Sequence, residues 1–90
     1  MTSFDLVWKR IRAHTGEKFH TIRGIEFTYI MEQDRLCPSR TIYWIAKNDF
    51  RKAYRMAPVD GPSVICNDVR GPSYVWAILH DKRIAESKWK

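Results

Sequence analysis

Three histidines and two cysteines are the side chains of this sequence that could ligate a metal ion. Cys37 and Cys66 are 29 positions apart, and His14 and His20 are six positions apart. Zinc sites built from short motifs place about two to four residues between two cysteines and about three to five between two histidines. The spacing does not fit that pattern, so we expect neither a metal ion nor another cofactor.

Two pairs of residues could carry out acid–base chemistry. His80 precedes Asp81, but consecutive residues of a helix point about 100° apart, so the carboxylate cannot easily orient the imidazole. His20 could meet Glu26 or Glu32 across a hairpin, although an exposed cross-strand pair is the simpler expectation. The sequence also has no glycine-rich phosphate loop and no serine in a nucleophile elbow. We therefore predict that the protein is not an enzyme.

Basic residues give the remaining chemical signal, because 16 lysines and arginines outnumber ten acidic residues and give a net charge of +6. Such a charge favours polyanionic partners. Six candidate binding residues lie close together in the sequence: Arg40, Tyr43, Lys47, Arg51, Lys52 and Arg55. The five cations would contact phosphates, and a base could stack on Tyr43. This pattern predicts a non-catalytic nucleic-acid-binding module.

Two other interpretations of these residues stay open on the sequence alone. In the first, Trp44 is a core residue, Tyr43 is half-buried, and the cations form an ordinary solvated surface. In the second, Tyr74, Trp76 and Trp89 do not all fit into one core, and the excess aromatic surface anchors a protein partner. A chain of this second kind would be a small inhibitor, an antitoxin-like partner or an accessory subunit.

The length of 90 residues suits one domain with a single hydrophobic core. We place that domain at residues 1–84 and expect a polar tail at residues 85–90 to fray. No apolar leader precedes a cleavage site, and no apolar run approaches the roughly 18 residues that cross a bilayer. We expect a cytoplasmic protein with reduced thiols and no membrane partner, with a single Cys37–Cys66 disulfide as the alternative.

Apolar residues at helical spacing predict three helices. The first begins with Thr2 or Ser3 as its N-cap and ends near residue 16. Its apolar face consists of Phe4, Val7, Trp8 and Ile11. Asn48 is the predicted N-cap of the second helix, which ends before Pro58 and buries one face around Phe50. The third helix is predicted at residues 72–82, with a proline in its first turn.

Alternating apolar and polar residues predict three strands. The first two lie at residues 18–22 and 25–32 and form a hairpin around Arg23-Gly24, where glycine accepts the positive φ of a short turn. Polar residues 32–35 form a second turn, and the third strand lies at residues 40–46. The stretch before it contains Pro38, which cannot sit inside a central ladder and is therefore expected to form a bend or an edge.

These elements combine into an α+β fold in the order α-β-β-β-α-α. A three-stranded antiparallel meander carries helices packed on one of its faces. Residues 58–72 form the longest irregular stretch, with a short strand or a helical turn near residue 65.

Overall fold

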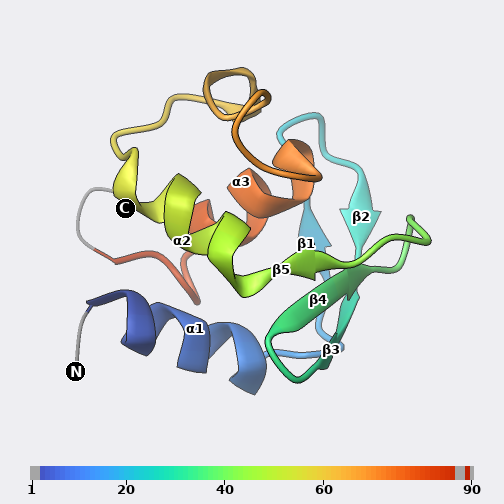
Figure 1. Ribbon diagram of the computed structural model, residues 1–90. Helices are drawn as coiled ribbons and strands as arrows, with labels where there is room; N and C mark the ends of the chain where they lie inside the picture. The colour runs from blue at the N-terminus through green and yellow to red at the C-terminus, as the bar shows by residue number, and fades with distance from the viewer. Residues whose placement is uncertain (1–2, 87–88, 90) are drawn as a thin grey trace.

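The computed structural model describes residues 3–86 and residue 89, and it has three α-helices, a short 3-10 helix and five strands. The helices are α1 (Ser3–Ala13), α2 (Lys47–Arg55), η1 (Pro62–Val64) and α3 (Pro72–His80). Figure 1 shows the three α-helices grouped together and the strands gathered toward the other side of the molecule. This arrangement confirms the predicted α+β class. Within the described residues, no helix combines the length and the apolar character that are needed to cross a bilayer.

Helix α1 forms where it was expected because its apolar side chains fall on one face. The buried residues are the predicted ones: Phe4, Val7, Trp8 and Ile11. At the end of the helix the hydroxyl of Tyr29 donates a hydrogen bond to the carbonyl oxygen of Ile11, which the helix leaves unpaired. Arg12 donates to the carbonyl oxygen of Gln33 at 2.9 Å. Thr2, one of the two predicted caps, lies outside the described residues.

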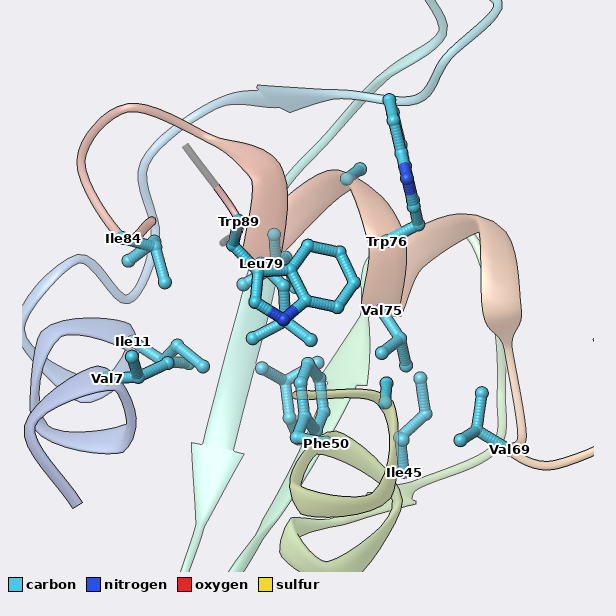
Figure 2. Close-up of a cluster of buried hydrophobic side chains, with 14 of the residues drawn as sticks. Val7, Ile11, Ile45, Phe50, Val69, Val75, Trp76, Leu79, Ile84 and Trp89 are labelled. Carbon is cyan, nitrogen blue, oxygen red and sulfur yellow. The ribbon is translucent and has the colours of Figure 1, made fainter. Parts of the chain in front are cut away.

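Helix α3 lies at the centre of the hydrophobic core. Residues 75–79 are all buried, so this part of the helix is covered on every side. A helix that is apolar all round is stable only in such surroundings. Figure 2 shows Leu79 beside Phe50 of α2, with apolar side chains of α1 on the other side of the cluster. Trp76 is buried too, and its Nε1 donates a hydrogen bond to the carbonyl oxygen of Val59 at 3.1 Å.

Two antiparallel sheets take the place of the single predicted meander. The strands are β1 (Phe19–His20), β2 (Glu26–Phe27), β3 (Tyr29–Glu32), β4 (Arg35–Pro38) and β5 (Ile45–Ala46). β1 pairs with β2, and β3, β4 and β5 form the second sheet in that order. The predicted strand at residues 25–32 is split at Thr28, whose N–H donates to the hydroxyl of Ser39 at 3.0 Å. The predicted turn at Arg23-Gly24 is confirmed, and Gly24 has a φ of 82°.

The predicted third strand at residues 40–46 exists only at residues 45 and 46, which form β5, whereas the predicted turn at residues 32–35 is confirmed. The strand that pairs with β3 is β4, which follows a turn of only two residues. Gln33 in this turn takes a φ of 53°, a left-handed conformation that few residues other than glycine adopt, and the chain can therefore reverse at once. Pro38 ends β4. Residues 39–44 form a loop in which Ile42 is 99% exposed, and only β5 returns to the sheet.

Helix α2 begins two residues earlier than predicted. Asn48 lies inside the first turn, and Ala46 occupies the N-cap without a side-chain hydrogen bond. The backbone N–H of Lys47 donates to the carbonyl oxygen of Asp34 at 2.8 Å. The turn between β3 and β4 thus supplies the partner that a capping side chain would otherwise give. The predicted apolar face is confirmed, with Phe50 fully buried.

The end of the chain packs against the core at the positions that the structure describes. Trp89 is only 2% exposed, and its Nε1 donates to the carbonyl oxygen of Tyr54 at 3.1 Å. The carboxylate of Glu86 lies 2.6 Å from the guanidinium of Arg10. The prediction of a frayed tail is therefore wrong at residues 86 and 89, because an indole buries a large apolar area when it finds a core to join. Residues 87, 88 and 90 lie outside the described part of the chain.

Arg83 joins the last segment of the chain to the loop that follows α1. Its guanidinium lies 2.8 Å from the carboxylate of Asp81 and 3.0 Å from that of Glu17. Its Cζ stands 3.8 Å from the centre of the Phe19 ring. Hydrogen bonds from His14 and Arg83 lower the pKa of Glu17. Partial burial by itself raises the pKa of Asp81, but hydrogen bonds from Arg83 outweigh this effect and hold that pKa below its ordinary value.

We predict that Arg83→Gln flattens the dependence of stability on pH at the acidic end. A carboxylate whose pKa is lower in the folded state stabilises the fold above its unfolded pKa, and this stability is lost as the pH falls through the folded pKa. Wild-type stability should therefore fall between about pH 5 and pH 2, and the variant should lose part of that slope. Urea unfolding at stepped pH measures it. R40Q removes an exposed arginine outside this network and should keep the wild-type slope; an unchanged slope in R83Q would contradict the prediction.

We also predict that Gly71→Ala destabilises the protein more than Gly16→Ala. Both glycines have positive φ, 61° and 87°, so both variants carry a backbone cost of about 1–2 kcal/mol. A Cβ on Gly71 would stand 2.7 Å from Cδ1 of Ile45 and 3.1 Å from the hydroxyl of Tyr43, whereas nothing lies within 4 Å at Gly16. Overpacking adds about 1–3 kcal/mol at Gly71 alone. Equal losses in urea unfolding would show that the close contact costs nothing.

Candidate nucleic-acid interface

Helix α2 carries four cations outside its buried face. We call them the α2 basic strip: Lys47, Arg51, Lys52 and Arg55. Three of them lie four residues apart and therefore follow one another on successive turns, and the fourth lies beside them. Burial of Phe50 and Ala53 fixes the rotation of the helix, because these residues must face the core. The remaining surface of the helix, with its cations, is thereby turned away from the core.

Two cations of the strip lie against aromatic rings of α1. Nζ of Lys47 stands 5.9 Å from the centre of the Trp8 ring, and Cζ of Arg51 stands 5.3 Å from that of Phe4. Both distances allow cation–π attraction, which orients the two side chains along the contact between α1 and α2. Phe4 and Trp8 are themselves buried, so they present no open face on which a base could stack. The strip therefore offers positive charge and hydrogen-bond donors.

The four cations of the strip form no ion pair between described residues, a property that other exposed cations such as Arg23, Arg40 and Lys82 share. Outside α2, four cations lie within 4 Å of a carboxylate oxygen: Arg10, Lys18, Arg35 and Arg83. None of the ion pairs between described residues involves the four cations of α2. Paired charges cancel one another over a short distance, whereas unpaired ones add to the surface potential. The strip therefore adds to the positive surface potential together with the other cations that have no ion pair between described residues, and it is distinguished by having four of them on one helix.

Tyr43, the predicted stacking residue, is already covered by a cation. It lies in the loop before β5, and Cζ of Arg70 stands 5.1 Å from the centre of its ring. Burial raises the pKa of Tyr43, Tyr74 raises it further, and Arg70 opposes this rise. The phenol therefore stays neutral at ordinary pH. A base could stack on this face only by replacing the guanidinium.

A second arginine–aromatic pair adjoins the first. Cζ of Arg35 stands 4.4 Å from the centre of the Trp44 ring, and Arg70 donates to the carbonyl oxygen of Trp44 at 3.5 Å. Neither Arg35 nor Arg70 is among the binding residues predicted from the sequence. Arg35 faces Ala46 across the β4–β5 ladder, so the correct register would have placed it diagonally opposite Trp44. Nothing in the sequence points to Arg70, because it approaches from 26 positions away.

The structure divides the six predicted residues into two groups. Four lie together on α2, while Arg40 and Tyr43 belong to the loop that precedes β5. Figure 1 shows this loop at the edge of the molecule, with β5 between it and α2. Trp44, the core residue of the alternative interpretation, is only partly buried, and Arg40 is exposed. The loop residues can therefore assist the strip but do not belong to it.

Of the acid–base pairs considered for catalysis, His20 and Glu26 meet on an exposed surface, whereas His80 and Asp81 each contact another residue. His80 stacks on Trp76 with ring centres 4.5 Å apart, while Asp81 bonds to Arg83. Nε2 of His20 lies 3.8 Å from the carboxylate of Glu26, but both side chains are more than half exposed. Both cysteines are free thiols. Among the described residues no group of three or more potential ligands could hold a metal ion.

Comparison with known proteins adds no functional assignment to this geometry. The charges and contacts of α2 and of the loop before β5 therefore have to indicate the function by themselves. The chain matches no protein-family model, no curated protein and no solved structure.

Proposed function

We propose that this protein is a non-catalytic module that binds nucleic acid through phosphate contacts from the α2 basic strip. The observation that carries the proposal is the concentration of four cations on one short helix. Four cations without ion pairs among the described residues lie on a helix of nine residues, while four others are held by carboxylates. Surfaces that bind phosphate backbones concentrate unpaired lysine and arginine in this way.

The dimensions of the strip suit a phosphate backbone. A helix of nine residues is about 13 Å long. Each strand of B-DNA carries a charge about every 3.4 Å along the helix axis, so the strip can reach about four phosphates of one strand. Arg40 and Arg70 would add contacts beside the amino end of α2. A cytoplasmic location is compatible with this role, since both cysteines are free thiols.

Binding of this kind should depend little on base sequence. Phe4 and Trp8 are buried, and Tyr54 of α2 packs partly buried against Phe4. Arg70 covers Tyr43, so no fully open aromatic ring among the described residues adjoins the strip. Phosphate contacts position a protein without reporting sequence, whereas base contacts specify it. We therefore expect duplexes of different sequence to bind with similar affinity, and single strands to gain no large stacking contribution.

A protein partner is the second candidate function, but on different residues from those first considered. Trp76 and Trp89 are buried in the core, and Tyr74 is partly buried, so the aromatic residues give no exposed anchor of the expected kind. The exposed apolar residues are aliphatic instead. Three of them, Ile22, Ile25 and Val64, line one groove.

We predict that K52Q/R55Q weakens binding to a random-sequence duplex about tenfold or more and reduces the salt slope of log Kd by about two, because each lost phosphate contact removes about 0.9 from that slope. Fluorescence anisotropy over a range of salt concentrations measures both quantities. The two side chains are exposed, so the fold should be unaffected.

The matched control is K18Q/K82Q. Each double variant changes the formal net charge from +6 to +4, but Lys18 and Lys82 lie outside α2. The control should bind nearly as well as the wild type. Equal weakening by both double variants would show a general charge effect without an interface at α2. An absence of wild-type binding at low salt would end the proposal.

A further inference from the structure

A groove of about 760 Å³ opens on the molecule, and its lining residues do not include the cations of the α2 basic strip. One wall is the turn between β1 and β2, and the other is the segment around η1. Figure 1 shows these two segments next to each other at the top of the molecule. The aliphatic residues Ile22, Ile25 and Val64 line the groove and are 54%, 44% and 47% exposed. Neighbouring aliphatic side chains with so much exposed surface mark a contact site.

The walls of the groove are held in place before any partner arrives. The N–H of Gly24 donates to the carbonyl oxygen of Thr21 at 2.8 Å, and the N–H of Ile25 donates to the Thr21 hydroxyl at 3.1 Å. Cδ1 of Ile22 lies 3.5 Å from the point where a Cβ on Gly61 would stand, so the turn rests against the opposite wall. A preorganised surface loses little conformational entropy on binding.

The groove carries one charge of each sign. Arg23 and Asp60 both line it, both are exposed, and neither takes part in an ion pair between described residues. The groove is therefore locally neutral on a protein with a net charge of +6. A polyanion would be repelled by Asp60, and a strongly acidic protein would meet the same carboxylate. A surface that complements this groove is apolar, and it places a negative charge opposite Arg23 and a positive charge opposite Asp60. A second copy of the groove, turned by a two-fold rotation, has its charges in these positions.

We propose that the groove is a self-association site at which two copies of this chain meet about a two-fold axis. In a contact with this symmetry, residue i of one copy meets residue j of the other, and the reverse contact forms as well. Arg23 of each copy then pairs with Asp60 of the other, and the aliphatic residues of both grooves pack between the two ion pairs. The inference does not depend on the proposed function, but it would give a nucleic-acid-binding protein two basic strips and thus higher avidity.

The size of the surface indicates a weak dimer. A standard interface buries about 800 Å² on each partner. The described chain exposes 5409 Å² in total, so such an interface would need about one seventh of it. A groove between one turn and one short helix supplies only part of that area. We therefore expect association that changes with protein concentration.

Sedimentation velocity without nucleic acid, over a roughly hundredfold range of protein concentration, tests the proposal by mass action. The wild type should shift from monomer toward dimer. V64S should raise the dissociation constant of the dimer about tenfold or more, because it removes exposed apolar surface from the groove without touching the core. I30S is the matched control, since Ile30 is 59% exposed and does not line the groove. It should self-associate like the wild type.

Charge exchange tests the two-fold arrangement itself. R23D and D60R should each be monomeric, because each variant brings like charges together in both reciprocal contacts. An equimolar mixture of the two variants should regain the dimer, since each contact then again joins opposite charges. A wild type that stays monomeric throughout overturns the proposal. So does a dimer that V64S leaves intact, or a mixture that stays monomeric.

Discussion

Helix α3 has no charged residue between Pro72 and Leu79 and is buried all around at residues 75–79, so other elements must cover it from several sides. α1 and α2 supply large side chains for this purpose, and Trp89 closes the cluster from the end of the chain. In a chain of 90 residues this core takes up most of the large apolar side chains, and those that stay exposed are mainly aliphatic. The charged residues consequently lie on the covering elements, and the way they are paired decides what the surface can bind.

Two kinds of arginine result from this arrangement. Arg83 is held by Asp81 and Glu17 and stabilises the junction between the end of the chain and the loop after α1. Arg55 and its neighbours on α2 have no such partners among the described residues and remain available to an external anion. The formal net charge is the same whichever arginines are paired. The burial of Phe50 and Ala53 places four of the unpaired cations on the remaining surface of α2 and so forms the basic strip.

Periodicity in the sequence predicted the helices well and the strands poorly. Phe4 and Phe50 lie on the buried faces that their spacing indicated, because a helical face depends only on residues one turn apart. The strand that pairs with β3 was missed although its turn at residues 32–35 was predicted, because Pro38 was expected to keep the stretch before it out of a ladder, whereas it only ends β4. The same error hid Arg35, whose contact with Trp44 follows from the correct register.

The sequence by itself determined the α+β class, the buried faces of α1 and α2, and the excess of positive charge. These features are local or compositional, so a linear reading captures them. Only the tertiary structure decided which cations are neutralised, that Arg70 covers Tyr43, and that Arg23 and Asp60 share an apolar groove. Each of these joins residues from separate segments, and such distances are set by packing around α3, which local spacing does not encode.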